Sequence, residues 1–291
     1  MQLHKGGAIQ SAPDSRDYRI DRCMELSSGG EALPEEFEVS WLPSEMKNQG
    51  IVQSCTGQAM STIFECIYHA KTGEGRQFST AWLYGNRREF DYDGKGMIMR
   101  IAAKNAAKYG DVFSETWDSK AEVKKVVDEF EAVFAEKEPY SKKLIKEYIS
   151  LRSEDEVKSF LIKYDIPIFV NCDMSAMCPV WSGLHALALY GYDKKYYYCR
   201  NSWGDYYPTV KLKFDDLKEK WGIVPMSETK FTDIESGRWS EEAIKAAAND
   251  GIIKGYPDGA FMPEKPLSRE EIAVIWQRMK NYCEEHYQKN L

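Results

Sequence analysis

Hydrophobic positions in the first half of the chain recur about every 3.6 residues, the period of an α-helix. The clearest of these runs predicts a helix from Cys55 to about Lys71, ended by a Thr-Gly pair. Two further helices are predicted over 79–88 and about 97–109. A serine with a glutamate three residues later forms a capping box for another helix over 154–164. This part of the chain is therefore expected to be mainly helical.

The pattern then changes to short runs of β-branched and aromatic residues. Strands are predicted over 166–171, 185–191, 196–201 and 209–214. The charged stretch 119–148 is expected to be helical or partly irregular, and 215–228 is expected to be a connector. A helical region followed by a β-rich region predicts an α+β fold of two lobes with a cleft between them.

The two ends of the chain differ from this two-lobe region. Residues 1–38 lack periodicity and are rich in turn-forming residues, which predicts an extended arm lying on another part of the molecule. A separate small unit over 229–291 is predicted to contain a helix over 240–250 and another from Ser268. About 60 residues are marginally stable alone, so this unit is expected to dock or to self-associate. The domain between the two ends is predicted over 39–228.

Composition excludes several classes of protein. Of the 291 residues, 43% are hydrophobic and 29% are charged, which is typical of a soluble globular protein. The net charge of −7 argues against nucleic-acid partners. No apolar run approaches the roughly 20 residues that span a membrane. The first residues have no apolar core of signal-peptide length, which predicts synthesis in the cytoplasm without standard export.

Seven cysteines in 291 residues are too few for a disulfide scaffold, and their number is odd. No CxxC or Cys/His cluster has the spacing of a zinc site, so no metal is expected. The cysteines are predicted to be mostly reduced, with one of them doing chemistry. Cys66 and Cys199 lie in apolar runs and are expected to be structural.

Cys55 is the candidate nucleophile. It opens a predicted helix, where the dipole and the unpaired N–H groups favour a thiolate. The alternative is a buried structural cysteine, which is the more common case for an isolated thiol. Polar Gln53 and Ser54 directly before it, and Gln49 one loop away, favour the functional interpretation.

His185 is the candidate base by elimination. The chain has four histidines, and His4 and His286 lie in terminal segments. His69 would lie ~21 Å along the helix from Cys55 at 1.5 Å per residue. The alternative for His185 is a hydrogen-bonded structural histidine.

Three further side chains complete a site for acyl transfer. Asn201 is expected on the neighbouring strand, where its side-chain oxygen would fix the tautomer of His185. Trp203 would shield that hydrogen bond from water. Gln49 and the backbone N–H of Cys55 would donate to a developing oxyanion. Each residue alone is ordinary, with Asn201 in a strand-end turn and Gln49 in a solvated loop, but their joint occurrence in this order favours an enzyme.

Together these residues resemble the papain family of cysteine peptidases, over about residues 35–225. The motifs are Gln49, Cys55, Gly183-Leu184-His185-Ala186 and Asn201-Ser202-Trp203-Gly204, and the segments 14–18 and 78–84 resemble its bacterial and viral branch. The resemblance implies a papain-like fold with a helical left lobe and an antiparallel β right lobe. It implies a nucleophilic Cys55 and a His185 acid/base. It also implies an orienting Asn201 and a Gln49 oxyanion donor, with Ser202 and Trp203 supporting them.

The chain departs from the family pattern near the nucleophile. A family cysteine is replaced by Val52, an aromatic residue by Thr56, and a glycine by Gln53, which is expected to narrow the cleft. These changes leave the substrate preference open. The residues expected to bind substrate are Gln53, Ser54, Asp93, Gly94, Gly183 and Leu184.

Residues 1–38 suggest a hypothesis about regulation. No long propeptide precedes the predicted catalytic domain, and the arm is punctuated by Gly, Pro and Ser. The arm is therefore expected to occupy the cleft and to restrain the enzyme until it is displaced or cut.

Residues 231–280 resemble one S-layer homology repeat, through Phe231-Thr-Asp-Ile, the Gly251–Pro263 segment and Leu267-Ser-Arg-Glu-Glu. The resemblance implies binding to a cell-wall polysaccharide. Such repeats usually come in threes, so a single copy implies either a homotrimer or packing on the main domain. Arg269 is the candidate contact to an anionic sugar. The alternative is that Arg269 only neutralises neighbouring glutamates.

The predicted function is hydrolysis of peptide or isopeptide bonds in a peptide or protein substrate, without a metal or an organic cofactor. The module implies association with a cell wall, an envelope or a phage particle, in a protein of bacterial or phage origin. One alternative is a catalytically silent papain-like scaffold that acts in wall binding or assembly. Another is an amidase or acyltransferase on the same fold.

Overall fold

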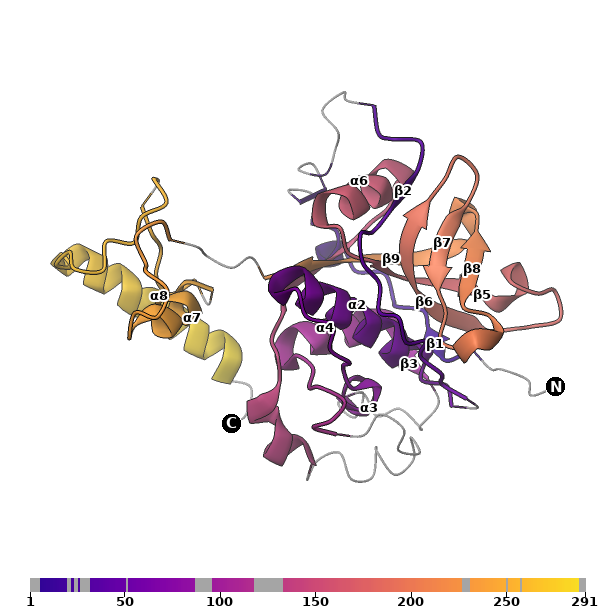
Figure 1. The fold of residues 1–291 in the computed structure, drawn as a ribbon, viewed down its shortest axis with the longest axis horizontal. Helices are drawn as coiled ribbons and strands as arrows, with labels where there is room; N and C mark the ends of the chain where they lie inside the picture. Colours follow the sequence, from indigo (N-terminus) through magenta and orange to yellow (C-terminus); the bar gives the residue numbers. More distant parts are fainter. Residues whose placement is uncertain are drawn as a thin grey trace. The chain divides into compact units, whose positions relative to one another are not determined.

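The structure is a computed structural model that describes residues 6–19, 22–23, 26, 32–50, 52–86, 96–117, 133–226, 231–249, 251–256 and 258–287. The chain divides into two compact units, Met1–Pro225 and Met226–Leu291 (Figure 1). Each unit is described by itself.

The helical lobe of the first unit is built around one long, almost entirely buried helix, α2 (Cys55–Thr72). Gly73 ends it in the left-handed conformation, as the Thr-Gly pair predicted. Helices α3 (Thr80–Gly85) and α4 (Met99–Tyr109) pack against α2. The other face of α2 contacts the sheet, which explains why nearly every side chain in its first three turns is buried.

The second lobe is a sheet of nine strands among the described residues. The strands are β1 (Ala8–Ile9), β2 (Phe37–Glu38), β3 (Met97–Ile98), β4 (Ile145–Ser150), β5 (Ile168–Asp173), β6 (Leu184–Tyr192), β7 (Tyr197–Arg200), β8 (Thr209–Leu212) and β9 (Leu217–Pro225). Their order is β3-β1-β6-β5-β9-β4, with β2 and β7 also pairing with β6, and β8 pairing with β7. Strand β6 is therefore the strand on which the lobes and the N-terminal arm converge (Figure 1).

Shorter elements connect these parts. Helix α6 (Glu154–Tyr164) begins with the predicted capping box between Ser153 and Glu156. The 3₁₀ turns are η1 (Ser15–Asp17), η3 (Glu138–Tyr140), η4 (Met174–Ala176), η5 (Gly204–Tyr206) and η6 (Phe214–Asp216).

Strands β4 and β9 correct the sequence prediction. The stretch 119–148 was expected to be helical or partly irregular, and 215–228 a connector, yet residues 145–150 and 217–225 form paired strands. Charged residues conceal them: β9 starts Leu-Lys-Glu-Lys, and only its second half is apolar. Because β9 lies between β5 and β4, backbone pairing on both sides outweighs its weak local β propensity.

Helix α4 begins two residues later than predicted. The expected start was residue 97, but Met97 and Ile98 form β3, which pairs in parallel with β1 of the arm. Strand pairing with a segment about 90 residues earlier in the chain therefore removes the first residues from the helix. Local sequence cannot reveal such a partner.

The core of the first unit lies between α2 and the central strands. Ile63 and Phe64 of α2 are fully buried, as are Val170 of β5 and Leu187 of β6. Each such side chain contributes about 1.5–3 kcal/mol by leaving water. The six cysteines described are all free, as predicted.

The second unit contains two helices, α7 (Glu241–Asn249) and α8 (Arg269–Tyr287), both near their predicted positions. The predicted capping box is present, since Ser268 and Glu271 exchange hydrogen bonds at the start of α8. Before it, Phe231 packs on Phe261 with ring centroids 4.9 Å apart. Throughout the described part of the chain, every helix is too short or too polar to cross a membrane.

Candidate active site

Cys55 is the first residue of α2, and its side chain is completely buried. Ser54 occupies the N-cap position without a side-chain capping bond. The thiol lies against the start of β6, where the backbone N–H of Ala186 points to the sulfur at 3.5 Å. The helical lobe and the sheet therefore meet at this sulfur.

Burial decides the ionisation of this thiol. Loss of solvent raises the pKa of Cys55, while the backbone N–H groups of Ala186 and Gly7 oppose that rise. The sequence predicted a lowered pKa, from the helix N-terminus. That prediction is wrong for the closed arrangement, because burial raises the pKa of the thiol more than the nearby N–H groups lower it.

His185 and Asn201 form a buried pair on neighbouring antiparallel strands. His185 is the second residue of β6, and Asn201 directly follows β7. Nε2 of His185 donates to Oδ1 of Asn201 at 2.8 Å. Nδ2 of Asn201 donates in turn to the carbonyl oxygen of Tyr207 at 2.8 Å. The amide is thus held with its oxygen toward the imidazole ring, which sets the tautomer of His185.

Tryptophan rings enclose this pair. The ring of Trp203 lies 4.7 Å from that of His185, tilted by 33°, and the residue is 2% exposed. Trp181 packs edge-on against Trp203 at 5.1 Å. The position of Trp203 agrees with the predicted shield, while Trp181 was not singled out from the sequence.

Gln49 is oriented by Ser202. The hydroxyl of Ser202 donates to Oε1 of Gln49 at 2.6 Å, and the two backbones pair through Gln49 N–H and Ser202 C=O at 2.9 Å. With Oε1 engaged, the amide nitrogen turns toward the loop before Cys55. There it donates to the carbonyl oxygen of Val52 at 2.8 Å. An amide nitrogen carries two hydrogens, so a second N–H remains for an oxyanion.

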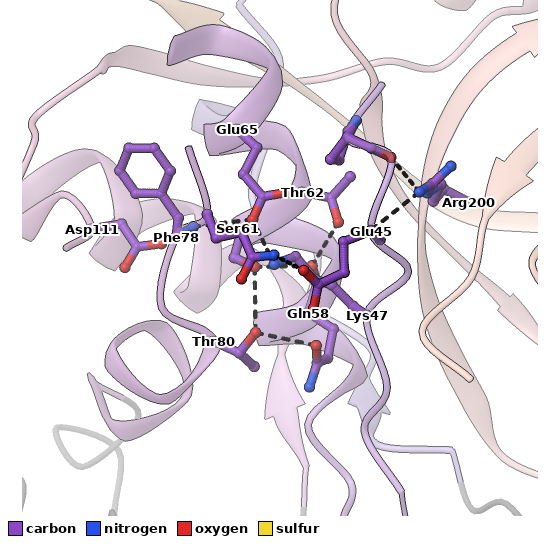
Figure 2. Close-up of polar contacts among 12 residues, drawn as sticks. Glu45, Lys47, Gln58, Ser61, Thr62, Glu65, Phe78, Thr80, Asp111 and Arg200 are labelled. Atoms are coloured by element: carbon purple, nitrogen blue, oxygen red, sulfur yellow. Dashed lines mark hydrogen bonds and ion pairs between the residues drawn. The ribbon is translucent and has the colours of Figure 1, made fainter. Parts of the chain in front are cut away.

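A buried ion pair fixes the Gln49 loop to helix α2. Lys47 lies two residues before Gln49, and its amine contacts the Glu65 carboxylate of α2 at 2.7 Å. The same carboxylate accepts a hydrogen bond from the backbone N–H of Phe78 at 3.0 Å. Figure 2 shows Glu65 reaching both partners within a wider polar cluster that includes Asp111. The ion pair therefore links the segment that carries Gln49 to the helix that begins at Cys55.

The N-terminal arm passes between the lobes at the thiol. Strand β1 of the arm runs parallel to β3 and antiparallel to β6, with Ala8 opposite Leu184. Just before it, the backbone N–H of Gly7 is close enough to the sulfur of Cys55 to lower the pKa of that thiol. The carbonyl oxygen of Gly7 accepts the N–H of Met97 at 2.8 Å. The arm therefore lies between β3 and β6, next to the buried sulfur of Cys55.

Polar contacts fasten the next part of the arm to the body of the unit. Arg100 of α4 contacts Asp17 at 2.8 Å and Asp14 at 3.4 Å. Further contacts join Ser11 to Glu219, Tyr18 to Glu156, and Arg22 to Glu147. These contacts extend along about ten residues of the arm, so its opening requires several of them to break together.

Three of the six predicted substrate-binding residues line the arm. Gln53 and Leu184 approach it from opposite sides, and Gly183 lies beside Gly6. Ser54 is buried and accepts a long hydrogen bond from Gln58 at 3.4 Å. Asp93 and Gly94 lie outside the described residues.

Sequence reasoning missed Gly6, Gly7 and Met174 as parts of the site. The Gly-Gly pair was an available signal, since two adjacent glycines near a chain end permit close backbone approach. Nothing in the local sequence marked Met174, which follows β5 and reaches Gly6 across the fold.

Neither a metal site nor a role for Arg269 follows from the geometry. Within the described residues, no three His, Cys, Asp or Glu side chains gather in a way that could hold a metal ion. Arg269 is exposed at the start of α8. Its neighbour Glu271 is engaged by the Ser268 cap and by the Tyr256 hydroxyl at 3.4 Å.

Solved structures share the fold of the first unit. Xylellain, a cysteine protease from Xylella fastidiosa, aligns with a TM-score of 0.59 and 21% identity, over 77% of this chain and 98% of that one. Procathepsin B from Trypanosoma congolense aligns with a TM-score of 0.57 and 14% identity, over 76% and 86% of the two chains. The first unit therefore has a papain-like fold, as predicted.

The second unit matches a family model and several surface proteins. Residues 230–273 match the S-layer homology domain. Outer membrane protein SlpA of Thermus thermophilus is 39% identical over 56 residues, which are 19% of this chain and 6% of SlpA. The cellulosome-anchoring protein of Acetivibrio thermocellus is 39% identical over 49 residues, 17% of this chain and 11% of that protein. The chain thus carries a C-terminal S-layer homology domain and spans a small fraction of these relatives.

Proposed function

We propose that the first unit is a cysteine peptidase that hydrolyses peptide or isopeptide bonds through Cys55. The observation that supports this most is the 2.8 Å hydrogen bond from His185 Nε2 to Asn201. His185 lies on β6, the same strand whose Ala186 N–H contacts the Cys55 sulfur. Because Nε2 is engaged, Nδ1 is the ring nitrogen that exchanges a proton with the thiol.

The reaction follows from these roles. The Cys55 thiolate attacks the carbonyl carbon of the substrate. The developing oxyanion accepts hydrogen bonds from the side-chain N–H of Gln49 and the backbone N–H of Cys55. His185 then protonates the leaving amine, and the amine departs as the thioester forms. Water, deprotonated by His185, hydrolyses the thioester and restores the thiol.

The arm is proposed to hold this site closed. It seals the sulfur, and a carbon atom added at Gly7 would lie 2.1 Å from the carbonyl oxygen of Gln53. Substitution of Gly7 by alanine is therefore expected to displace the arm without touching the catalytic side chains. This gives an opened form of the full chain.

Hydrolysis of an unfolded protein such as reduced casein tests the activity. The Gly7→Ala chain is expected to degrade it, and the double variant with Cys55→Ala is expected not to. Absence of hydrolysis with an unreactive thiol would favour a silent scaffold that acts in assembly. Transfer to an added amine in place of hydrolysis would favour an acyltransferase.

Comparison with the unsubstituted chain tests the arm. Gly75→Ala is a matched control, because Gly75 is exposed and an added carbon would only touch the Trp41 ring at 3.3 Å. Gly7→Ala should raise the rate of hydrolysis, and Gly75→Ala should leave it unchanged. Equal rates in all three chains would exclude restraint by the arm.

The S-layer homology domain is proposed to bind an anionic cell-wall polysaccharide and to place the peptidase at a cell surface. The exposed guanidinium of Arg269 is the proposed contact, since it can form paired hydrogen bonds with an anionic group. Cosedimentation with purified wall polymer tests the binding. Loss of binding in Arg269→Ala, but not in the more distant Arg278→Ala, is the expected result.

The single domain is also proposed to associate with copies of itself. Ile272, Trp276 and Met279 of α8 are exposed and recur on one face of the helix. Ile275, half-buried, lies on the same face. An exposed apolar stripe of this kind is typical of an association surface. Three copies would reproduce the usual number of such repeats.

A further inference from the structure

The space beside the thiol is one backbone wide where Gly6 and Gly7 cross it. A β-carbon on Gly6 would lie 2.3 Å from the carbonyl oxygen of Leu184, and one on Gly7 would lie 2.1 Å from that of Gln53. Real β-carbons essentially never approach other atoms this closely. Both walls are backbone carbonyls, which cannot rotate away as a side chain can.

A third wall of this space, at Gly96, lies equally close to the arm. An added carbon on Gly96 would lie 2.3 Å from the carbonyl oxygen of Gly7, and the φ of Gly96 is +82°. Next to it, the N–H of Met97 donates to that same oxygen. Glycine is therefore used on the wall as well as in the arm, which keeps the gap at the width of a bare backbone.

The narrow part coincides with the nucleophile. The backbone N–H of Gly7 is close enough to the Cys55 sulfur to lower its pKa, and a β-carbon on Gly6 would meet both the Leu184 carbonyl and the sulfur atom of Met174. One residue further along, the side chain of Ala8 is accommodated and buried, and that of Ile9 is half-buried. Within the described part of the arm, which begins at Gly6, the restriction therefore covers Gly6 and Gly7.

We propose that this slot selects peptide substrates with two adjacent glycines beside the thiol. A substrate must take the place of the arm to reach Cys55, and the same backbone walls then exclude a β-carbon at either position. The inference rests on the proposed peptidase function and adds the substrate class: extended segments containing Gly-Gly. The proposal also explains why the arm has Gly6 and Gly7 at this place: like a Gly-Gly substrate, they carry no β-carbon for the walls to exclude.

Matched fluorogenic peptides test the selectivity on the full chain opened by Gly7→Ala. Two peptides are compared that differ only in a central Gly-Gly or Ala-Ala pair. We expect kcat/KM to be about tenfold or more higher for the Gly-Gly peptide, with cleavage at or next to the pair by mass spectrometry. The variant Met174→Ala in the same background should keep the preference, because the Leu184 carbonyl remains.

A second readout needs no turnover. The Gly-Gly peptide should slow alkylation of Cys55 in the opened chain, and the Ala-Ala peptide should not. Equal cleavage and equal protection by the two peptides would overturn the selectivity and leave the peptidase function standing. Absence of cleavage of both peptides and of casein would overturn both.

Alkylation of Cys55 also tests whether the slot excludes a β-carbon. Gly6→Ala provides an independent opened chain. If both Gly6→Ala and Gly7→Ala leave the thiol as protected from alkylation as in the unsubstituted protein, the slot tolerates a β-carbon and the proposal fails.

Discussion

Single hydrogen bonds orient the side chains of His185 and Gln49 at this site. Asn201 accepts a hydrogen bond from Nε2 of His185, and the hydroxyl of Ser202 donates one to Oε1 of Gln49. In both cases an adjacent residue of one short motif orients a side chain from elsewhere. The Asn-Ser-Trp segment therefore orients both the proposed base, His185, and the proposed oxyanion donor, Gln49.

Substitutions at Gln49 and Ser202 separate donating from orienting. Gln49→Ala removes an oxyanion donor, so kcat in the opened chain should fall about 100- to 1,000-fold. Ser202→Ala leaves the amide in place but less well oriented, so a loss of about tenfold is expected. Neither change should alter the alkylation of Cys55 in the same chain. Equal losses for the two variants would contradict the orienting role of Ser202.

Asp111 gives a pH-dependent prediction for stability. Its complete burial raises its pKa well above the usual value. The folded state therefore binds more protons than the unfolded state above about pH 4, and the unfolding free energy falls as pH rises from there to the folded pKa. Asp111→Asn removes this dependence. It can also keep the bond from Val112 N–H to Oδ1.

Urea denaturation of the wild type and Asp111→Asn at about pH 4.5 and about pH 8 measures the effect. The difference between the two proteins should shift in favour of the variant at the higher pH. A difference that does not depend on pH would show that Asp111 does not titrate in this way.

At the residue scale the sequence predicted Cys55, His185, Asn201 and Gln49. In the structure His185 contacts Asn201 directly. Cys55 contacts Ala186 and Gln49 contacts Ser202, the neighbours of that pair in the chain. The four residues were predictable because each belongs to a short motif with chemical meaning. The direction of the thiol pKa was not predictable, because it depends on how completely the folded chain buries the sulfur.

At the scale of elements, the arm behaves as part of the sheet. Strand β1 joins β3 of the helical lobe to β6, so the arm bridges the two sides of the site. Its later residues are held by ion pairs that are only partly buried. Such pairs contribute little individually and are weakened by salt.

Loss of one ion pair should loosen the arm measurably. Arg100→Ala removes the contacts to Asp14 and Asp17, which together contribute about 1 kcal/mol. Alkylation of Cys55 in the otherwise unsubstituted chain should become up to about fivefold faster. Lys108→Ala, on the same helix α4 with its amine against Tyr109, is the matched control. A rate unchanged by Arg100→Ala would mean that this contact does not hold the arm.

Elements with strong local signals were predicted well, and those made by distant pairing were not. Helix α6 was predicted to the residue by its capping box. Strands β4 and β9 were missed because each is stabilised by pairing with the other, which lies about 70 residues away in the chain. Strand β3 was predicted as helix, because only the arm gives it a partner.

At the scale of the whole molecule, a papain-like unit and an S-layer homology domain share one chain. Three chains joined through the second unit would carry three catalytic sites. Binding of several Arg269 side chains to one polymer would then increase the overall affinity.

Sedimentation equilibrium tests the assembly. The unsubstituted protein should have the mass of three chains of 33.5 kDa each. Trp276→Ser should dissociate it, since burying this side chain contributes about 2–3 kcal/mol. Gln277→Ser, next in the helix, should remain associated. A monomer at tens of micromolar for the unsubstituted protein would contradict self-association.

The most direct test of the central claim is the pH dependence of Cys55 modification by an epoxysuccinyl inhibitor, read from the mass of the intact protein between about pH 4 and pH 9. We expect one adduct in Gly7→Ala that forms well below the free-thiol pKa of about 8.5 and is absent after Cys55→Ala. The unsubstituted chain should react slowly and only at higher pH, because burial raises the pKa of Cys55. An opened chain whose Cys55 reacts no faster at neutral pH than a free thiol would contradict an activated nucleophile.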